Sequence, residues 1–317
     1  MPGFTTHYLF GVDAYRDIPF TSVKYNLNIN HNAFALGLQG PDLFFYYLPS
    51  YLFHRYNLGA IAHDQKTGEF FSYLLESRLQ FSGDSHKLAI ADAYITGFLG
   101  HYTLDCIAHP YIYAFTGYTP KNPPKQVDYF GQHAYFETEL DKLILYKKKH
   151  KRPSRFHQHT TILLSPLQKK VISQMLGYAY RNTYPDLWVH NLMIGQAVFW
   201  MQAGTALMRD PHGQKKVIAR LIERFLIGHA FLSPMVASDH YRFVRDPLNQ
   251  THRAWIHPWT GAGSHESFPE LYRRAERIYH HRILCYYQMI HEGFTAEGRA
   301  AFLREYGNRS FLSGESL

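Results

Sequence analysis

Three side chains of the kind that bind metals stand at regular intervals in a largely apolar stretch. His101, Asp105 and His109 are spaced four and four within Gly97–Tyr111. Residues four apart lie on one face of an α-helix at intervals of about 6 Å, so a helix here presents imidazole, carboxylate and imidazole in a line. Because buried polar groups without partners are costly, this spacing favours a metal-binding helix.

A second pair of candidate ligands follows on the next predicted helix. His133 and Glu137 are again four residues apart. Two ligands on one helical turn, joined by others from neighbouring helices, are typical of zinc sites built from His nitrogen and carboxylate oxygen. A single His on an apolar helix is usually a satisfied core residue, but two such pairs separated by one loop favour a shared metal site.

The types of residue present narrow the choice of metal and of chemistry. The chain has two cysteines, Cys106 and Cys285, so a thiolate cluster is excluded and zinc is favoured, with manganese or iron as alternatives. An ExxH motif, which di-iron carboxylate bundles use, does not occur. Neither Cys106 nor any serine has a visible base partner for nucleophilic catalysis.

Composition indicates a globular chain with anionic partners. Its 317 residues are 46% hydrophobic and 16% aromatic, and their net charge is +8. A positive net charge favours phospholipid surfaces, phosphate esters or nucleic acid as partners. We also expect transient contact with an anionic membrane surface. The basic run at 147–152 is better explained as the solvated end of a helix than as a lipid or nucleic-acid patch.

The sequence also predicts where the chain resides. Its opening residues lack a basic segment followed by an apolar one, and no apolar run reaches the roughly 18 residues of a transmembrane helix. Two cysteines cannot form a disulfide framework, which fits a reducing compartment. We therefore expect a cytoplasmic protein with no transmembrane segment, or a secreted one if a leader has been removed.

Helices must position the candidate ligands, because strand-like alternation is nearly absent and helical periodicity recurs throughout. The predicted fold class is all-α, a multi-helical single domain. We expect residues 1–150 to form a metal-binding helical core and residues 151–317 a helical C-terminal half packed on it, with a linker near 151–155. Predicted helices span 60–80, 87–109 (ended by Pro110), 130–149, 165–183, 186–209 and 213–232, with a final helical pair over 269–306.

Five segments carry a family resemblance. In order, they are HYLFG, GLQGPDLFFYY, AHDQKTGEFF, GFLGHYTLDCIAHPYIY and GQHAYFETELD, within about the first 145 residues. Together they resemble the bacterial zinc-dependent phospholipase C family, whose superfamily includes fungal single-strand nucleases. A later segment, DPLN…PWTG…ESF, is similar to one in intracellular members and has no assigned role. The resemblance implies an all-α fold with a zinc cluster.

The resemblance also implies a set of ligands, carried over by motif position. One zinc would be held by His63, His101 and Asp105, with Asp42 beside it. A second would be held by His109, His133 and Glu137, and a third by His7 with Asp105 as a bridge. Secreted members complete the third site with an amino-terminal tryptophan, whereas this chain begins with Met1, so two to three Zn²⁺ ions are expected. His54 is an alternative to His63.

The implied activity is hydrolysis of a phosphodiester by metal-activated water, with Asp42 orienting or deprotonating that water. Phospholipase C-like cleavage of phospholipid to diacylglycerol and a phosphorylated head group is the favoured reaction. A nuclease or small-molecule phosphodiesterase or phosphatase on the same cluster is an alternative, and so is a non-catalytic, metal-stabilised binding domain. The aromatic residues at 44–47 and 111–113 fit core packing better than a rim that meets substrate.

Overall fold

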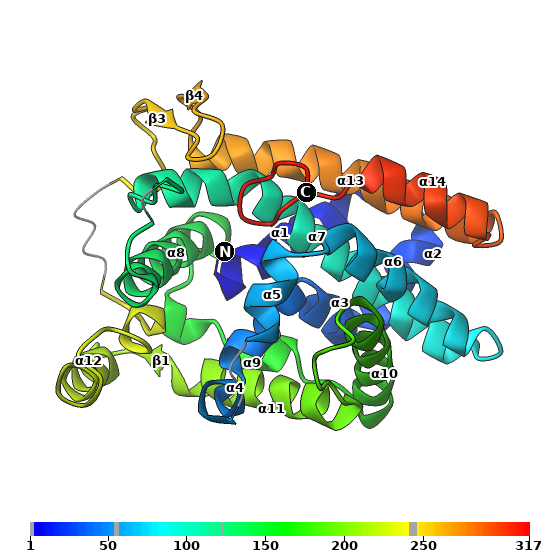
Figure 1. The fold of residues 1–317 in the computed structure, drawn as a ribbon, viewed down its shortest axis with the longest axis horizontal. Coiled ribbons are helices and arrows are strands. Elements are labelled where there is room, and N and C mark those ends of the chain that lie inside the picture. Colours follow the sequence, from blue (N-terminus) through cyan, green and yellow to red (C-terminus); the bar gives the residue numbers. More distant parts are fainter. Residues whose placement is uncertain (1–2, 54–56, 122, 241–245) are drawn as a thin grey trace.

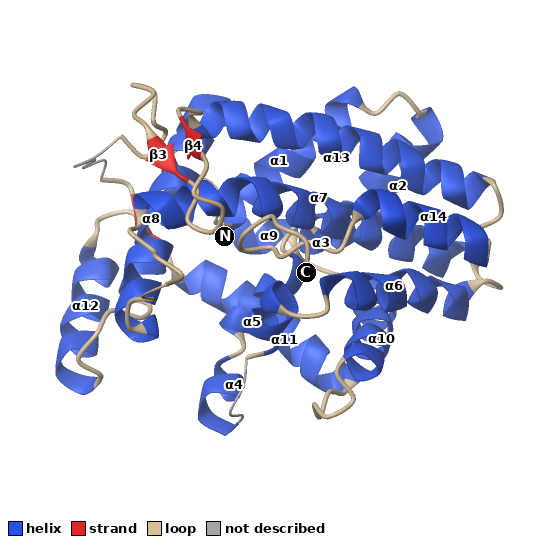
Figure 2. Ribbon diagram, turned by 45° about the horizontal axis from the view of Figure 1, so that its top comes forward, coloured by secondary structure: helices blue, strands red, loops and turns tan. Residues whose placement is uncertain are grey.

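Helices make up nearly all of the regular structure (Figure 2). The computed structural model describes residues 3–53, 57–121, 123–240 and 246–317. Among these residues, strands are confined to two short pairs, so the predicted all-α fold class is confirmed. None of the helices described here combines the length and apolar character that a membrane span requires.

The helices of the first half include the four that carry candidate ligands. They are α1 (Phe4–Asp17), α2 (Thr21–Ile29), α3 (His31–Gly37), η1 (Gly40–Tyr46), α4 (Leu48–Phe53), α5 (Leu58–Asp64), α6 (Thr67–Ser77), η2 (Arg78–Phe81), α7 (Ser85–Phe115) and α8 (Gln126–Lys149). Those of the second half are η3 (Pro153–Arg155), α9 (Gln158–Thr161), α10 (Pro166–Thr183), α11 (Asn191–Leu207), α12 (Gln214–Leu226), η4 (Ser233–Met235), α13 (Phe268–His291) and α14 (Ala296–Tyr306).

Two small sheets tie loops of the second half together. Strand β1 (Arg209–Asp210) pairs in parallel with β2 (Ala237–Ser238), and Arg209 lies opposite Ala237. Strand β3 (Trp255–Ile256) pairs antiparallel with β4 (Gly263–Ser264), and Trp255 lies opposite Ser264.

Helix α7 is the centre of the fold, and α1, α3, α10 and α13 pack around it (Figure 1). It is apolar on nearly all sides, as expected of a central helix, and most of its residues from Ile90 to Ile112 are buried. Gly37 and Gly97 allow α3 to cross α7 closely, because a Cβ at Gly97 would lie 2.1 Å from the carbonyl oxygen of Phe34. This crossing fixes the segment after α3 against the ligand face of α7.

The prediction that Pro110 ends the central helix was wrong. Helix α7 continues through Pro110 to Phe115. Proline inside a helix costs about 3 kcal/mol, but here the last turn is held by packing. Tyr111 and Ile112 are buried, and the Tyr111 hydroxyl donates to the carbonyl of Pro247 at 2.8 Å. Tertiary burial therefore overrides the local helix-breaking effect.

Other helix limits also differ from the prediction. The helix expected over 60–80 is divided into α5 and α6, because Lys66 adopts a left-handed conformation with φ of 53°. Helix α12 ends at Leu226 rather than near residue 232, where the chain turns back through η4. The break before α6 lets α5 approach the ligand face of α7 at its own angle.

The predicted linker at 151–155 is an ordered connection. Its centre forms η3, and Asp239 accepts hydrogen bonds from the backbone and the hydroxyl of Ser154 at 2.9 and 2.6 Å. The second half also contacts the first directly, since the Tyr279 hydroxyl on α13 donates to the carbonyl of Thr96 at 2.8 Å. The division at residue 150 stays a prediction.

Candidate metal centre

The candidate ligands converge from four helices and one 3-10 turn onto the middle of α7. Helix α1 carries His7, η1 carries Asp42, α5 carries His63, α7 carries His101, Asp105 and His109, and α8 carries His133 and Glu137. Within the described chain they form three groups whose potential ligand atoms lie within 4.8 Å of one another. The groups are His7, His101 and Asp105; Asp42, His63 and His101; and His109, His133 and Glu137.

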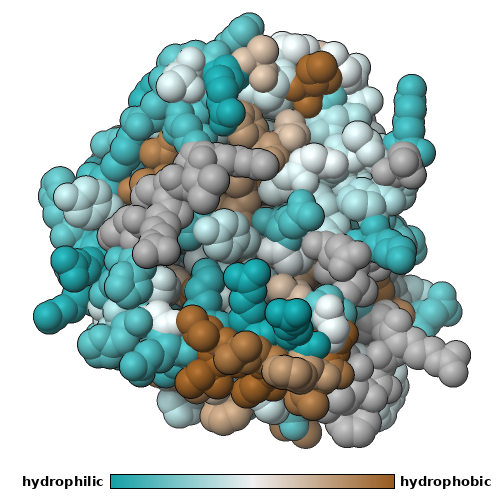
Figure 3. Space-filling model, turned by 90° about the vertical axis from the view of Figure 1, so that its left-hand side faces the viewer, coloured by the Kyte–Doolittle hydropathy of each residue, from teal (hydrophilic) through white to brown (hydrophobic). Residues whose placement is uncertain are grey.

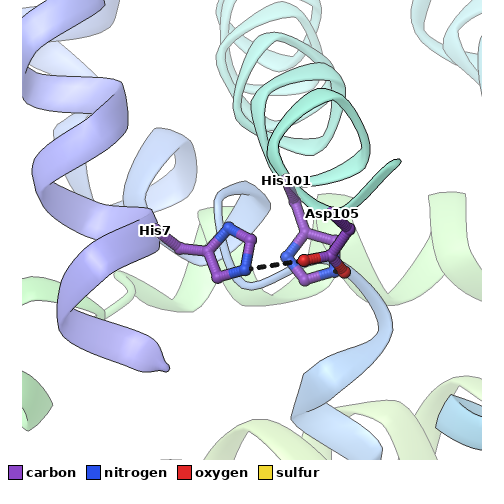
Figure 4. Close-up of side chains that lie close together, drawn as sticks. All are labelled: His7, His101 and Asp105. Carbon is purple, nitrogen blue, oxygen red and sulfur yellow. Dashed lines mark ion pairs between the residues drawn. The ribbon is translucent and has the colours of Figure 1, made fainter. Parts of the chain in front are cut away.

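Asp105 is the link between the first two groups. Its Oδ1 lies 3.1 Å from Nε2 of His7, and its Oδ2 lies 3.0 Å from Nε2 of His101. The close-up in Figure 4 shows His7 reaching across from α1 toward these α7 residues. The two oxygens therefore face histidines from different helices, and the bridging role that the family resemblance implies stays a prediction.

Asp42 and His63 close the cluster on the other side of His101. Nε2 of His63 lies 3.2 Å from Oδ1 of Asp42 and 3.5 Å from Oδ2 of Asp105. Nε2 of His101 lies 3.7 Å from the same Asp42 oxygen. Asp42 therefore stands within the ligand group rather than beside it. The competing residue His54 lies outside the described residues.

The third group lies one turn further along α7. His109 faces His133 across 5.8 Å between ring centroids, and Nε2 of His133 is 2.8 Å from Oε1 of Glu137. His109 is fully buried, whereas the side chains of His133 and Glu137 are 13% and 12% exposed. This group is thus the part of the cluster nearest to solvent.

Backbone carbonyls orient three of the histidines. Nδ1 of His63 donates to Gly59 at 2.6 Å, Nδ1 of His101 to Leu38 at 3.2 Å, and Nδ1 of His109 to Phe311 at 2.6 Å. A carbonyl only accepts, so each Nδ1 carries a proton and each Nε2 is the nitrogen available to a metal. This second layer of bonds is typical of metal-ligating histidines.

Close packing holds the orienting segments in place. Gly40 has φ of 50°, and a Cβ there would lie 2.2 Å from the ring of His101. The chain after α3 can therefore reach the imidazole only with glycine at this position. At the start of α1, Asp141 of α8 accepts hydrogen bonds from the backbones of Thr5 and Thr6 at 2.9 and 2.8 Å, which fixes the helix that carries His7.

The electrostatics of the cluster suit cations. Burial alone lowers the pKa of His63, but the nearby carboxylates of Asp105 and Asp42 raise it to about 9, so the metal-free ring carries an additional proton near pH 7, which a bound cation would replace. Burial opposes the charge of Asp105, yet neighbouring histidines, His101 foremost, hold its pKa well below its usual range. For His109 and His133, burial lowers the pKa, so both rings are neutral near pH 7. Carboxylate with neutral imidazole is the protonation state that metal binding requires.

The cluster fits a metal because several of its buried atoms have no hydrogen-bond partner within the described chain. They are Nε2 of His7, His63, His101 and His109, Oδ1 of Asp42, and both carboxylate oxygens of Asp105. Orphaned buried polar atoms of this kind are rare and costly in folded proteins. Cations held by these groups would satisfy them, and a nitrogen and oxygen donor set suits zinc.

Aromatic side chains surround the outer group. The ring of Tyr113 lies 4.8 Å from His133 and 5.0 Å from Trp259, and Tyr118 lies 5.5 Å from Trp259. These rings are partly exposed, whereas Tyr111 is buried. The expectation of core packing for 111–113 therefore holds for Tyr111 and Ile112 but not for Tyr113, which faces the site.

The segment resembling intracellular family members frames this aromatic group. Trp255 donates to the carbonyl of Glu266 at 3.0 Å, and the amide of Asn249 donates to Arg253 at 2.9 Å. These bonds fold residues 247–268 over the end of α7 and present Trp259 to the site.

Phe311 is a functional residue that the sequence did not predict. Its N–H donates to the carbonyl of His63 at 3.3 Å, while its carbonyl accepts from His109. Its ring also lies 4.9 Å from His63. Phe311 therefore connects two ligand groups, and no residue pattern signals this, because any residue type can supply a backbone carbonyl.

Cys106, also on α7, is not suited to nucleophilic catalysis. Burial raises the pKa of its thiol to about 12, so the thiol is protonated near pH 7. Its Sγ instead donates to the carbonyl of Ser310 at 3.5 Å. The chemistry of the site therefore rests on the histidine and carboxylate cluster.

A helical fold with histidines and carboxylates in this arrangement defines a candidate metal-binding protein. The family described as zinc dependent phospholipase C matches residues 6–193, which include every candidate ligand. The chain belongs to this family. No curated protein and no solved structure matches it.

Proposed function

We propose that the protein is a zinc-dependent phosphodiester hydrolase that cleaves phospholipids to diacylglycerol and a phosphorylated head group. The observation that carries the proposal is the set of orphaned ligand atoms around Asp105, which lies within the segment matched by the family. Bound zinc supplies Lewis-acid stabilisation of phosphoryl oxygens and lowers the pKa of a bound water. Two to three ions are proposed, held by the three ligand groups.

Asp42 is the proposed catalytic residue. Its side chain is 7% exposed, and Oδ1 faces His63 and His101 without a hydrogen-bond partner in the described chain. A carboxylate there orients the attacking water and accepts its proton. His63, with Nδ1 held by the carbonyl of Gly59, would hold a metal ion beside Asp42. The attack displaces the alkoxide of diacylglycerol, and no covalent intermediate on the protein is required.

The partly exposed aromatic group supports a lipid substrate. Tyr113, Tyr118 and Trp259 form an apolar margin beside His133, the ligand nearest to solvent. Apolar rings at the margin can contact acyl chains while the phosphate reaches the metal ligands. Exposed aromatic rings can also stack on nucleobases. A nuclease is therefore the alternative function that the test must distinguish.

The test combines metal analysis with a panel of substrates. The purified protein is expected to contain zinc and to release phosphocholine from phosphatidylcholine faster than it cleaves single-stranded DNA or a small phosphodiester. Asp42→Asn is expected to retain at least two zinc ions and to lose hydrolysis by at least about a hundredfold, the scale of a positioned general base. Unchanged turnover in Asp42→Asn would remove that residue from catalysis. Preferential cleavage of DNA would reassign the substrate.

A further inference from the structure

Helix α12 presents its apolar face to solvent, which reverses the usual orientation of an amphipathic helix. Its large apolar side chains are all more than half exposed. They are Val217 (58%), Ile218 (56%), Leu221 (51%), Ile222 (51%), Phe225 (83%) and Leu226 (78%). Figure 1 shows α12 at the left edge of the molecule, and Figure 3 views that side, where hydrophobic residues form a band in the lower part.

The polar side of the same helix faces the protein. Glu223 is its buried residue, and its Oε1 accepts hydrogen bonds from the backbones of Leu232 and Ser233. Lys216 donates to the carbonyl of Val236 at 3.3 Å and lies over the ring of Tyr135 at 4.9 Å. These bonds hold α12 with its apolar face outward, so the exposure is a consequence of the fold.

Positive charge accompanies the apolar face. Lys215, Arg220 and Arg224 are exposed on α12. Beside the start of the helix, Arg152, Arg155 and Arg209 contribute to a hollow of about 460 Å³, which also involves Pro211 and His212. An exposed apolar stripe flanked by cations is the pattern of helices that lie in the interface of a membrane containing anionic lipid.

We infer that α12 is a membrane-docking helix whose apolar face enters the surface of an anionic phospholipid bilayer. Its cations then meet lipid phosphates, and the arginine-lined hollow accepts a head group. A second copy fits less well, because the exposed charged side chains of α12, Lys215, Arg220 and Arg224, are all cationic and two such faces would repel each other. The choice of a lipid surface rests on the proposed function, while the orientation of α12 does not.

Vesicle flotation of the full-length zinc-loaded protein tests this inference. The protein is expected to float with vesicles of phosphatidylcholine and phosphatidylglycerol and to bind less to phosphatidylcholine alone. The double variant Ile218→Glu with Phe225→Glu should weaken binding at least about tenfold, since each change removes buried apolar surface and adds a repelled charge. Leu192→Glu is the matched control, because Leu192 is 74% exposed but lies on α11. Its binding is expected to stay unchanged.

Hydrolysis assays separate this inference from the proposed function. The α12 double variant should keep wild-type activity on monomeric short-chain phosphatidylcholine and lose activity on vesicles. Asp42→Asn should still float with vesicles although it does not hydrolyse phospholipid. A wild-type protein that binds vesicles but does not hydrolyse phospholipid would refute only the proposed function. Equal flotation of the wild type and the α12 variant would overturn the docking role. So would a concentration-dependent dimer in sedimentation velocity that the same variant abolishes.

Discussion

The carbonyl of Phe311 accepts a hydrogen bond from Nδ1 of His109 at 2.6 Å, although the two residues are far apart in the sequence. This bond determines which nitrogen of His109 is available to a metal. The Phe311 ring is 2% exposed and packs against His63 and His101. The C-terminal segment is therefore part of the candidate metal centre, as its position over the middle of α7 also indicates (Figure 1).

Two variants separate the roles of Phe311. Phe311→Ala keeps the backbone carbonyl and should lower the free energy of unfolding by about 3 kcal/mol through loss of buried surface, with most zinc retained. Removal of residues 311–317 also deletes the carbonyl and should lower zinc content. Both quantities can be measured by denaturation and elemental analysis. Leu317→Ala, at a residue 54% exposed, should change neither. Full zinc content in the truncated protein would contradict the orienting role of residue 311.

Asp105→Asn should reduce zinc content, hydrolysis and thermal stability together. Asp105 faces His7 and His101 with different oxygens, and replacing one of them by an amide nitrogen removes an acceptor and the charge. We expect a loss of stability on the order of 3 kcal/mol, because a buried charged network is broken. Asp84→Asn is a control on the same helix, since Asn also caps helices well. A variant that binds zinc like the wild type would exclude the bridging assignment.

The free energy of unfolding at acidic pH should depend on the protonation of Asp141. Burial raises the pKa of this carboxyl from 3.8 to about 6, although bonds from Thr6 and Thr5 oppose the shift. The folded state therefore holds the proton more tightly than the unfolded state. The protonated Asp141 carboxyl therefore adds roughly 3 kcal/mol to the free energy of unfolding. This contribution is complete below pH 3.8 and is lost as the pH rises through 6.

Asp141→Asn removes this titration. In urea denaturation of the metal-free protein, the stability of the wild type relative to the variant should fall between about pH 4 and pH 6. A difference that is constant across this range would show that the carboxyl titrates normally. The metal-free form is used so that acid release of zinc does not add to the measured change.

The crossing of α3 over α7 should not tolerate a methyl group. Gly97→Ala places a Cβ 2.1 Å from the Phe34 carbonyl, so the helices must separate, at a cost of about 1–3 kcal/mol. Separation also draws Leu38 away from His101 and should lower zinc affinity. Gly83→Ala is the matched control, since a Cβ there meets nothing within 4 Å. Equal melting temperatures for the two variants would count against the close crossing.

Much of the site follows from the sequence, because ligand spacing on a helix is a local property. His101, Asp105 and His109 share a face of α7, and His133 and Glu137 share a turn of α8, as their intervals predict. The orienting carbonyls of Leu38, Gly59 and Phe311 could not be predicted, since a backbone carbonyl has no residue signature. They become visible only when distant segments meet.

The same distinction applies to the fold. The helical pattern predicts α12, but periodicity does not say which face packs inward. Here the hydrogen bonds of buried Glu223 fix the orientation of the helix. At Pro110, local propensity predicts a helix end, whereas burial of Tyr111 and Ile112 extends α7 by another turn. Tertiary packing therefore determines the features that local rules miss.

The contact between Phe311 and His109 has a consequence for the order in which the site forms during synthesis. His7 is synthesised before α7, and the carbonyl that selects the His109 tautomer follows 202 residues after His109. Contacts of such long sequence separation form late in folding. A nascent chain that has not yet reached residue 311 contains every candidate ligand but lacks the carbonyl that orients His109, so the site is complete only after residue 311 has been synthesised.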